Sequence, residues 1–408
     1  MLSVEPSVFK NAIGIKREEL LEEGIPGFVF ATPTGMISSK KMIRNIDFER
    51  SENLNFLEQQ KKWLEQAKQQ LTDQIQETDN SELIIVGSLP FDNRDLPELS
   101  IAEARNTHLA DIAEVSCTTL CAENTEAKLL PQHADYVDGV RKLVEIMQKT
   151  ELKKAVLARA IDLKTTEKIN IVELFSRLLM SNPEGYTFAL AQNPQKNGWF
   201  MGASPELLVA KQNENVFSHP VAGTLIRSEN HAEDQAQAER LLASAKDHYE
   251  HRLVIESIAD LLSPLCKTLN IPKTPSLIKT QTLWHLATPV QGKLKDPEQH
   301  IFDLVSVLHP TPAVCGQPAQ LARSLISELE PFQRNLFAGT MGWSDAHGNG
   351  AWSVNVRCGR IRDQSARLYA GAGIVEASQP ELELSETAAK FKTMFNALGL
   401  KAEELVFN

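Results

Sequence analysis

Apolar residues recur with helical spacing in several stretches of the chain. Between residues 53 and 77, the apolar side chains fall on one helical face: Leu57, Leu64, Ala67, Leu71 and Ile75. This spacing is typical of an amphipathic helix. The same kind of pattern predicts helices over residues 133–149, 172–179, 233–262, 301–308 and 318–328, and a final helix near the C-terminus. We expect residues 233–262 to form one long helix that ends before Pro264.

Short apolar runs between polar or Gly- and Pro-containing stretches predict strands. They cover residues 83–87, 154–161, 186–191, 199–202, 206–210, 216–219, 276–280, 337–343, 351–357 and 367–370. We expect the four runs between 186 and 219 to form an antiparallel meander. Residues 92–130 are polar and irregular, and a soft boundary at 125–132 separates residues 1–130 from 131–408 within one compact domain. Long runs of strands with helices between them predict an α+β fold.

The most informative stretch lies near the C-terminus, at residues 367–375 and 385–390. The first part predicts a buried strand with Gly371 and Gly373 at its end, where a ligand can approach the backbone because no Cβ is present. Glu386 and Lys390 are four residues apart, so a helix places them on one face. Such a pair is usually solvent-exposed, but the glycine strand upstream favours a site. No third glycine follows, which excludes a dinucleotide-binding motif.

Composition and charge narrow the function classes. The chain has 408 residues, 42% of them hydrophobic and 23% charged, as in ordinary globular proteins. A net charge of -11 without a basic stripe argues against a nucleic-acid partner. No signal pattern and no apolar run of transmembrane length is present, so we expect a cytoplasmic protein with no membrane partner. Its five scattered cysteines predict reduced thiols rather than a zinc site: Cys117, Cys121, Cys266, Cys315 and Cys358.

Two residues at strand starts are candidates for proton transfer. Lys154 precedes an apolar run. It either extends to solvent or is buried, and a buried amine can serve as a base. Glu206 follows Pro205 at the start of another strand and is either a surface residue or a general acid with a raised pKa. The spacing alone does not decide between these alternatives.

Other candidates concern metal and substrate binding. Glu250 and Glu386, on separate predicted helices, could form a carboxylate pair of the kind that Mg²⁺ prefers. His248 and His251 suggest zinc, but the His-Glu-x-x-His motif is absent. His285, between Trp284 and Leu286, is either a core residue or a site residue. Two prolines make residues 308–316 a rigid loop, and Arg357 ends a strand where it could bind a carboxylate.

Several of these stretches together resemble the chorismate-utilising enzymes, and within that family the siderophore-type (2,3-dihydroxybenzoate) isochorismate synthases. The matching segments occur in the expected order between about residues 130 and 400, whereas residues 1–130 match loosely. They are residues 154–159, 202–208, 220–224, 241–251, 283–289, 309–313, 370–375 and 386–390. The resemblance implies two large antiparallel sheets packed face to face, with helices outside.

The resemblance also implies roles for individual residues. Lys154 would be the base that activates water for attack at C2 of chorismate, and Glu206 the acid that protonates the departing C4 hydroxyl. Glu250 and Glu386 would hold Mg²⁺, which in turn binds the substrate's ring carboxylate. The remaining residues would line the substrate: Gly223, Thr224, His285, Ala313, Arg357, Gly371 and Lys390. Val314 departs from the leucine that the siderophore enzymes often carry there.

Within the family, a salicylate synthase would use the same acid and base and then eliminate pyruvate. Aminodeoxychorismate synthases have a lysine where this chain has Ala222, and anthranilate synthases lack a lysine at position 154. An isochorismate synthase for menaquinone and a non-catalytic metabolite-binding protein remain alternatives. We expect a monomer, with a downstream pathway enzyme as a possible partner.

Overall fold

The computed structural model describes residues 25–107, 125–192, 198–401 and 405–407. Its helices are α2 (Phe56–Thr78), α3 (His133–Met147), α4 (Ile171–Ser181), α5 (His231–Ala243), α6 (Ala245–Leu262), α7 (Ile301–Leu308), α8 (Ala319–Leu329) and α9 (Pro380–Leu398). None of the described helices is long and apolar enough to cross a membrane. Cys117 and Cys121 lie outside the described residues, and the described cysteines Cys266, Cys315 and Cys358 are free thiols.

The first ten strands are β1 (Phe28–Thr32), β2 (Gly35–Asn45), β3 (Leu83–Leu89), β4 (Glu98–Thr107), β5 (Glu126–Leu130), β6 (Lys154–Lys164), β7 (Tyr186–Gln192), β8 (Gly198–Ser204), β9 (Leu207–Gln212) and β10 (Asn215–His219). The others are β11 (Val221–Ile226), β12 (Cys266–Asn270), β13 (Ser276–Lys279), β14 (Leu283–Ala287), β15 (Val290–Leu294), β16 (Gly316–Gln317), β17 (Thr340–Asp345), β18 (Gly350–Val354), β19 (Cys358–Arg362), β20 (Ser365–Ile374) and β21 (Val406–Phe407).

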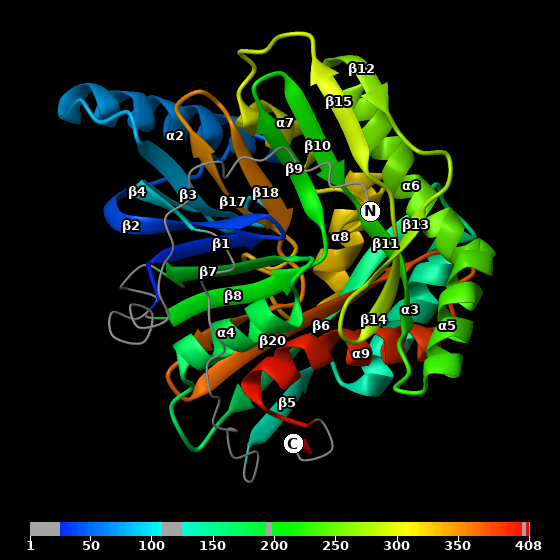
Figure 1. The fold of residues 1–408 in the computed structure, drawn as a ribbon. Helices are drawn as coiled ribbons and strands as arrows, with labels where there is room; N and C mark the ends of the chain where they lie inside the picture. Colours follow the sequence, from blue (N-terminus) through cyan, green and yellow to red (C-terminus); the bar gives the residue numbers. More distant parts are fainter. Residues whose placement is uncertain (1–24, 108–124, 193–197, 402–404, 408) are drawn as a thin grey trace.

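Eighteen of these strands pair in one continuous network. Its order is β12, β15, β10, β9, β18, β17, β3, β4, β2, β1, β7, β8, β19, β20, β6, β5 and β21, with β16 also on β6. Figure 1 shows the strands from β12 to β4 in the upper part of the molecule and those from β7 to β5 in the lower part. The predicted fold class is confirmed, with the two sheets joined edge to edge through β2 and β1.

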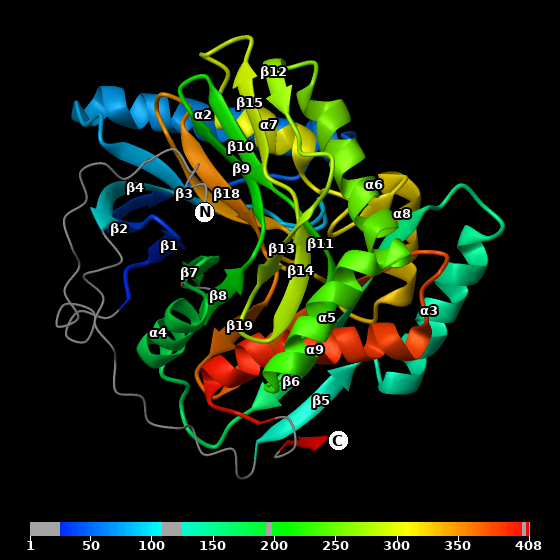
Figure 2. The same cartoon turned by 45° about the vertical axis from the view of Figure 1, so that its right-hand side comes forward.

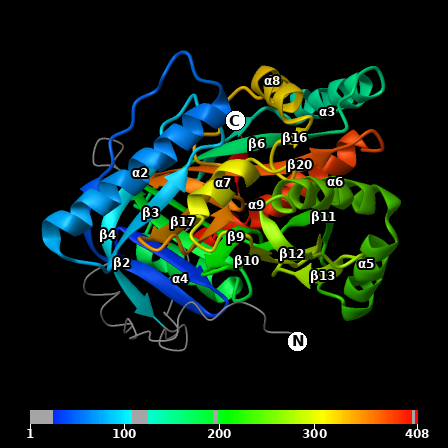
Figure 3. The same cartoon turned by 90° about the horizontal axis from the view of Figure 1, so that it is seen from above.

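Two apolar clusters hold the layers together. The larger joins strands of both halves, such as Phe30 of β1 and Trp352 of β18, with Trp63 of α2 and Phe302 of α7. Figure 3 shows α2 and α7 side by side over the strands of the upper half. The second cluster lies under α4 and α9, and Phe391 belongs to it. The apolar helical faces read from the sequence therefore cover opposite sides of the strand network.

The helix predictions hold except at one place. Residues 301–308 form α7 as predicted, and the other helices agree within a few residues. The predicted helix over residues 233–262 is wrong, because α5 ends and α6 begins at Ser244. This residue has extended backbone angles (φ -74°, ψ 108°), and its hydroxyl accepts a hydrogen bond from the Asp247 backbone N–H. Ser244 therefore caps α6 and breaks the continuous helix.

The strand predictions fail where pairing depends on distant segments. The predicted meander is wrong, because β7 pairs with β8 and β9 with β10, but β8 then pairs with β19 and β9 with β18. The irregular structure predicted for residues 92–130 is also wrong for its described parts, which contain β4 and β5. The boundary predicted at residues 125–132 stays a prediction, and β5, which lies within it, pairs with β6.

A separate three-stranded sheet, β11-β14-β13, completes the fold. Helices α5 and α6 pack on β11 and β14, and α9 also contacts β11. Figure 2 shows this small sheet in the middle of the molecule, between the upper strands and α9. Helix α9 in turn packs along β20, which pairs with β6 over its whole length. This arrangement brings segments far apart in the sequence to one point between β6, β20, α6 and α9.

Candidate active site

A single narrow cavity at this point contains most of the predicted site residues. It is lined by nine of them: Glu206, Gly223, Thr224, Glu250, His285, Ala313, Arg357, Gly371 and Lys390. The other two, Lys154 and Glu386, each form an ion pair with a lining residue. The cavity volume is about 50 Å³, whereas small-molecule sites usually exceed about 300 Å³. A ring-sized ligand must therefore displace side chains to enter.

Lys154 and Glu250 form a buried ion pair at the cavity. Lys154 Nζ lies 3.0 Å from Glu250 Oε1, and the lysine side chain has 0% exposure. Burial by itself raises the pKa of Glu250, but Lys154 and then Lys246 outweigh it, so the pKa is lowered. A Cβ on Gly373 would lie 2.0 Å from Glu250 Oε1 and 2.8 Å from Lys154 Cε. Any side chain at this position would therefore have to displace the Lys154–Glu250 pair.

Glu206 occupies the turn between β8 and β9 and is 4% exposed. Burial raises the pKa of its carboxyl to about 8, although the charge of Lys154 and a backbone hydrogen bond from Val221 act in the opposite direction. At pH 7 this side chain is therefore mostly protonated. A neutral carboxyl group beside a buried lysine has the protonation state of a general acid.

Arg357, His285 and Thr224 form a hydrogen-bonded row along one wall. Arg357 Nη2 lies 3.3 Å from His285 Nε2, and His285 Nδ1 lies 3.0 Å from Thr224 Oγ1. Burial, followed by the charge of Arg357, lowers the pKa of His285. The imidazole is therefore neutral, and since Nε2 accepts from Arg357, Nδ1 carries the proton and donates to Thr224.

Two backbone features give this row its geometry. Arg357 has φ +53°, in the left-handed region that costs a non-glycine residue about 1–3 kcal/mol. Gly223 has φ +79° at an irregularity in the pairing of β11 with β14, and a Cβ there would lie 3.0 Å from the Cβ of Asp247. The bulge directs Thr224 toward His285. The neighbouring β20 contributes Gly371, whose carbonyl accepts a 2.7 Å hydrogen bond from Lys390 Nζ.

The predicted pairing of Glu386 with Lys390 on one helical face is present, at 2.5 Å between Oε1 and Nζ. The pair is largely buried rather than solvent-exposed, with 14% and 10% side-chain exposure. Sequence reasoning missed a third carboxylate, Glu383, one turn earlier on α9, which pairs with Lys246 of α6 at 2.7 Å. Burial and then the charge of Glu386 raise the pKa of Glu383 to about 7. The i, i+3 spacing of Glu383 and Glu386 was the available signal.

This carboxylate cluster fits a divalent cation in its chemistry. Burial lowers the pKa of Lys246, but Glu250, Glu383 and Glu386 together raise it well above its ordinary value. The two predicted ligands, Glu250 of α6 and Glu386 of α9, therefore both lie close enough to Lys246 for their charges to raise its pKa. Magnesium usually takes one or two carboxylates and completes its shell with water and substrate oxygens. Among the described residues, no group of three or more His, Cys, Asp or Glu side chains is arranged to hold a metal ion by itself.

His248 and His251 do not form a zinc pair. His251 Nε2 lies 2.7 Å from Thr288 Oγ1, and burial lowers the pKa of His251 to about 4. His248 Nε2 instead lies 2.9 Å from the carbonyl oxygen of Leu242, on the exposed side. The two imidazoles therefore serve different hydrogen bonds, and their spacing of three residues reflects the helix rather than a metal.

A family model described as "Chorismate binding enzyme" matches residues 58–399, which include every residue of this cavity. The chain belongs to the chorismate-binding enzyme family. It is 38% identical over 391 residues to isochorismate synthase DhbC of Bacillus subtilis, covering 94% of this chain and 97% of that protein.

Solved structures agree with this assignment. The structure assigned as the 2,3-dihydroxybenzoate-specific isochorismate synthase DhbC of Bacillus anthracis has a TM-score of 0.86 and 39% identity, covering 94% of this chain and 100% of that one. The menaquinone-specific isochorismate synthase MenF of Escherichia coli has a TM-score of 0.73 over 91% of this chain and 88% of that one. At 23% identity, MenF shows the shared fold alone.

Proposed function

We propose that this protein is an isochorismate synthase of the 2,3-dihydroxybenzoate type, an isomerase that converts chorismate to isochorismate. The observation that carries the proposal is the meeting of a protonated Glu206 with Lys154 at one cavity, within range for the lysine charge to lower the pKa of the glutamic acid. Similarity to DhbC along nearly the whole chain supports the same activity. Moving a hydroxyl group across a ring needs one acid and one base, positioned about a ring apart.

In the proposed reaction, Lys154 accepts a proton from the water that attacks C2, and Glu206 donates a proton to the C4 hydroxyl as it leaves as water. One water is consumed and one is released, so the net change is an isomerisation. The side chains finish with Lys154 protonated and Glu206 ionised, and a proton must pass back before the next turnover. Glu250 Oε1 lies 3.0 Å from Lys154 Nζ, so Glu250 is the side chain that would position the proposed base.

Charge complementarity supports binding of the substrate in this cavity. Chorismate carries two carboxylates, and Arg357 and Lys390 supply cations that line the cavity. Burial lowers the pKa of Arg357 to about 10, so it remains charged at pH 7. Glu250 and Glu386 would hold Mg²⁺, which when bound would neutralise their charge and bind the ring carboxylate of the substrate. Thr224 and His285 complete the wall beside Arg357.

Salicylate synthase is the main alternative. It would use the same acid and base, but it would release pyruvate and form an aromatic ring, which makes the reaction irreversible. The small Ala313 next to Val314 in the cavity wall favours isochorismate. The similarity to the 2,3-dihydroxybenzoate-specific structure supports that pathway over menaquinone.

A product assay separates these activities. Purified protein with chorismate and Mg²⁺ should form isochorismate and reach a plateau with chorismate still present, because reactant and product have the same kinds of bonds. Starting from isochorismate should regenerate chorismate. Stoichiometric pyruvate in a lactate dehydrogenase assay would instead identify a salicylate synthase, and no turnover at all would favour a non-catalytic binding protein.

A further inference from the structure

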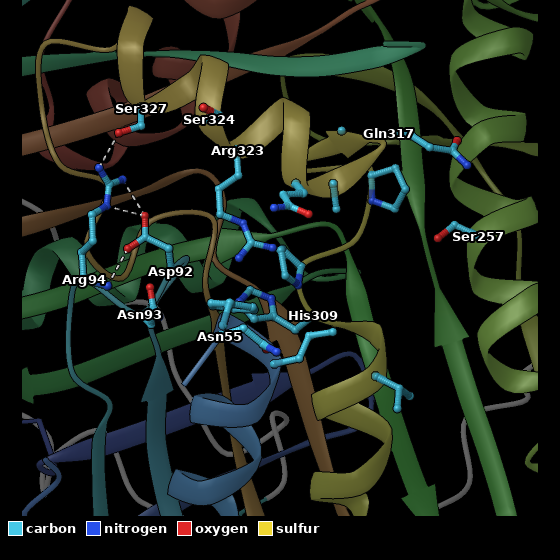
Figure 4. A pocket seen from close by; sticks show the side chains of 18 of the residues that line it. Asn55, Asp92, Asn93, Arg94, Ser257, His309, Gln317, Arg323, Ser324 and Ser327 are labelled. Atoms are coloured by element: carbon cyan, nitrogen blue, oxygen red, sulfur yellow. Dashed lines mark hydrogen bonds and ion pairs between the residues drawn. The ribbon is translucent and has the colours of Figure 1, made fainter. Parts of the chain in front are cut away.

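A second and much larger cavity, of about 1100 Å³, opens on the other side of the active-site wall. It lies between the start of α2, the C-terminal parts of α6 and α7, and helix α8. Figure 4 shows side chains from these elements converging on it. Its volume is at the upper end of the range for small-molecule sites, about 300–1,000 Å³. The proposed reaction uses none of its residues.

The segment from His309 to Gln317 separates the two cavities. His309, Pro312 and Gln317 line the outer cavity, whereas Ala313 and Val314 line the active-site cavity. The lining of the outer cavity therefore has no residue in common with that of the active site. A ligand there would contact the reverse side of the segment that forms the active-site wall.

Arg323 of α8 projects into the middle of this outer cavity, toward His309 (Figure 4). Its guanidinium carbon lies 4.1 Å from the centre of the Phe56 ring, so one face of the cation is stacked. Its Nε is buried without a hydrogen-bond partner, and no ion pair with a carboxylate is found for it among the described residues. The thiol of Cys315 is a titratable neighbour, and Arg323 opposes the rise in the pKa of this thiol that burial causes. The cation is thus held in place by an aromatic ring but not neutralised.

Arg94, which lines the same cavity, shows the contrast. Its guanidinium binds Asp92 through Nε at 2.9 Å and Nη2 at 2.5 Å, and Nη1 donates to Ser327 at 2.7 Å. Arg94 is therefore fully engaged by its neighbours, as a structural arginine should be. Arg323 is the arginine of this cavity with unused capacity for an anion.

The rest of the lining suits an apolar ring. Leu57, Leu261 and Val307 line the cavity and are 57%, 38% and 38% exposed, which is unusual for large apolar side chains from three different helices. Pro310 and Pro312 add rigid apolar surface. A cavity with convergent apolar walls and one uncompensated cation has the composition of a site for a small amphiphilic anion.

We propose that this outer cavity binds a small aromatic carboxylate, with the carboxylate on the Arg323 guanidinium and the ring against the leucine, valine and proline side chains. The guanidinium face is covered by Phe56, so the carboxylate meets the edge of the guanidinium, where a planar two-point contact is strongest. This site does not depend on the proposed reaction, and its occupancy can be measured without turnover.

Titration of the purified full-length chain with 4-fluorobenzoate, followed by ¹⁹F NMR, tests the proposal. Wild-type protein should bind the probe, and Arg323→Gln should weaken binding at least about tenfold, the loss expected for a charged two-point hydrogen bond. Glu328→Gln, which removes an opposite charge from the same cavity lining, should bind as tightly as wild type or more tightly. The neutral amide 4-fluorobenzamide should bind much more weakly than the acid.

Two further variants locate the ligand. Arg357→Gln removes the active-site arginine and should leave the Arg323-dependent binding unchanged. Gln320→Trp, at an exposed position of α8, should fill the cavity and block binding while Arg323 stays in place, which covers the case that Arg323→Gln does not fold. The proposal is overturned if wild-type protein does not bind the probe. It is equally overturned if binding survives in Arg323→Gln, or if only Arg357→Gln abolishes it.

Discussion

Two clusters of buried charge contact β6, and they differ in how completely their hydrogen-bonding groups are satisfied. One is the active-site cluster around Lys154, Glu206 and Glu250. The other is the pair of Glu330 and Arg334, whose side chains are each 2% exposed. Burial alone therefore does not distinguish a structural charge from a functional one in this molecule.

The Glu330–Arg334 pair has a partner for nearly every polar atom. Arg334 contacts Glu330 through Nε at 2.8 Å and Nη2 at 2.5 Å, and donates to the carbonyl oxygens of Val314 and Val156 at 2.8 and 2.7 Å. Glu330 also accepts a 2.8 Å hydrogen bond from the Ala158 backbone. These bonds tie the active-site wall to β6, and neither side chain needs a ligand to complete its contacts.

In the active-site cluster, by contrast, several buried polar groups lack a full set of hydrogen-bond partners. Lys154 Nζ has one ion-pair partner and no hydrogen bond of good geometry, while burial holds the pKa of Glu206 near 8. Glu383 is crowded by Glu386, and its pKa is raised to about 7. Charges buried without full compensation cost stability, so their presence points to a role in binding or catalysis.

Removing the metal should have the largest effect, because it acts on the active-site cluster and not on the Glu330–Arg334 pair. EDTA should abolish turnover of the wild type and added Mg²⁺ should restore it, and Glu250→Ala or Glu386→Ala should abolish Mg²⁺-dependent activity. The melting temperature without metal should change little in Glu386→Ala, because Glu386 is crowded by Glu383. Glu250→Ala should lower it, because the substitution leaves Lys154 buried without its ion-pair partner. The matched control is Glu381→Gln, an exposed carboxylate on the same helix, which should retain activity. Full turnover in EDTA would exclude the metal, and better restoration by zinc than by Mg²⁺ would contradict the assignment of magnesium.

Breaking the structural pair should have the next largest effect, on stability. Arg334→Met leaves Glu330 buried without its partner and should lower the free energy of unfolding by about 3–5 kcal/mol. Urea denaturation measures this loss, with the exposed Arg362→Met as the control that should change stability by less than about 0.5 kcal/mol. A loss below 1 kcal/mol would show that the pair is dispensable and would weaken the comparison.

Removing the proposed acid or base should lower the reaction rate, whereas breaking the structural pair lowers stability. Lys154→Ala and Glu206→Gln should each reduce kcat at least about 10²-fold, the usual effect of losing a proton-transfer partner. Lys153→Ala, the adjacent but exposed lysine, should leave kcat unchanged. Circular dichroism spectra of the variants check that each one is folded. Near-wild-type kcat in either site variant, with the fold intact, would show that its assigned role is wrong.

The smallest expected effect is the change of kcat/KM and of stability with pH. Glu206 must be protonated to act as an acid, and its pKa of about 8 predicts that kcat/KM falls as pH rises above 8, approaching tenfold per pH unit. The folded-state pKa is raised, so ionisation also opposes folding. Relative to Glu206→Gln, the wild type should lose stability as pH rises from about 4.5 to 8. A stability difference that does not vary with pH in this window would contradict a buried, protonated Glu206.

The sequence alone determined the local elements whose pattern is strong. Helix α7 begins and ends where its apolar spacing predicts, and the apolar face of α2 is buried at Leu64, Ala67 and Leu71 as expected. The glycine strand and the i, i+4 pair of Glu386 and Lys390 also lie together at the candidate active site. These features depend on neighbours in sequence, where periodicity and glycine geometry act directly.

The tertiary structure decided everything that depends on distant partners. The sequence expected a meander through β7, β8, β9 and β10, but β8 and β9 find their next partners in β19 and β18. It could not choose whether Lys154 extends to solvent or is buried, because that depends on Glu250 of α6 and the narrow passage at Gly373 of β20. Desolvation and ion pairing arise from contacts between elements, so only the assembled fold shows which charges are buried and which of them lack full compensation.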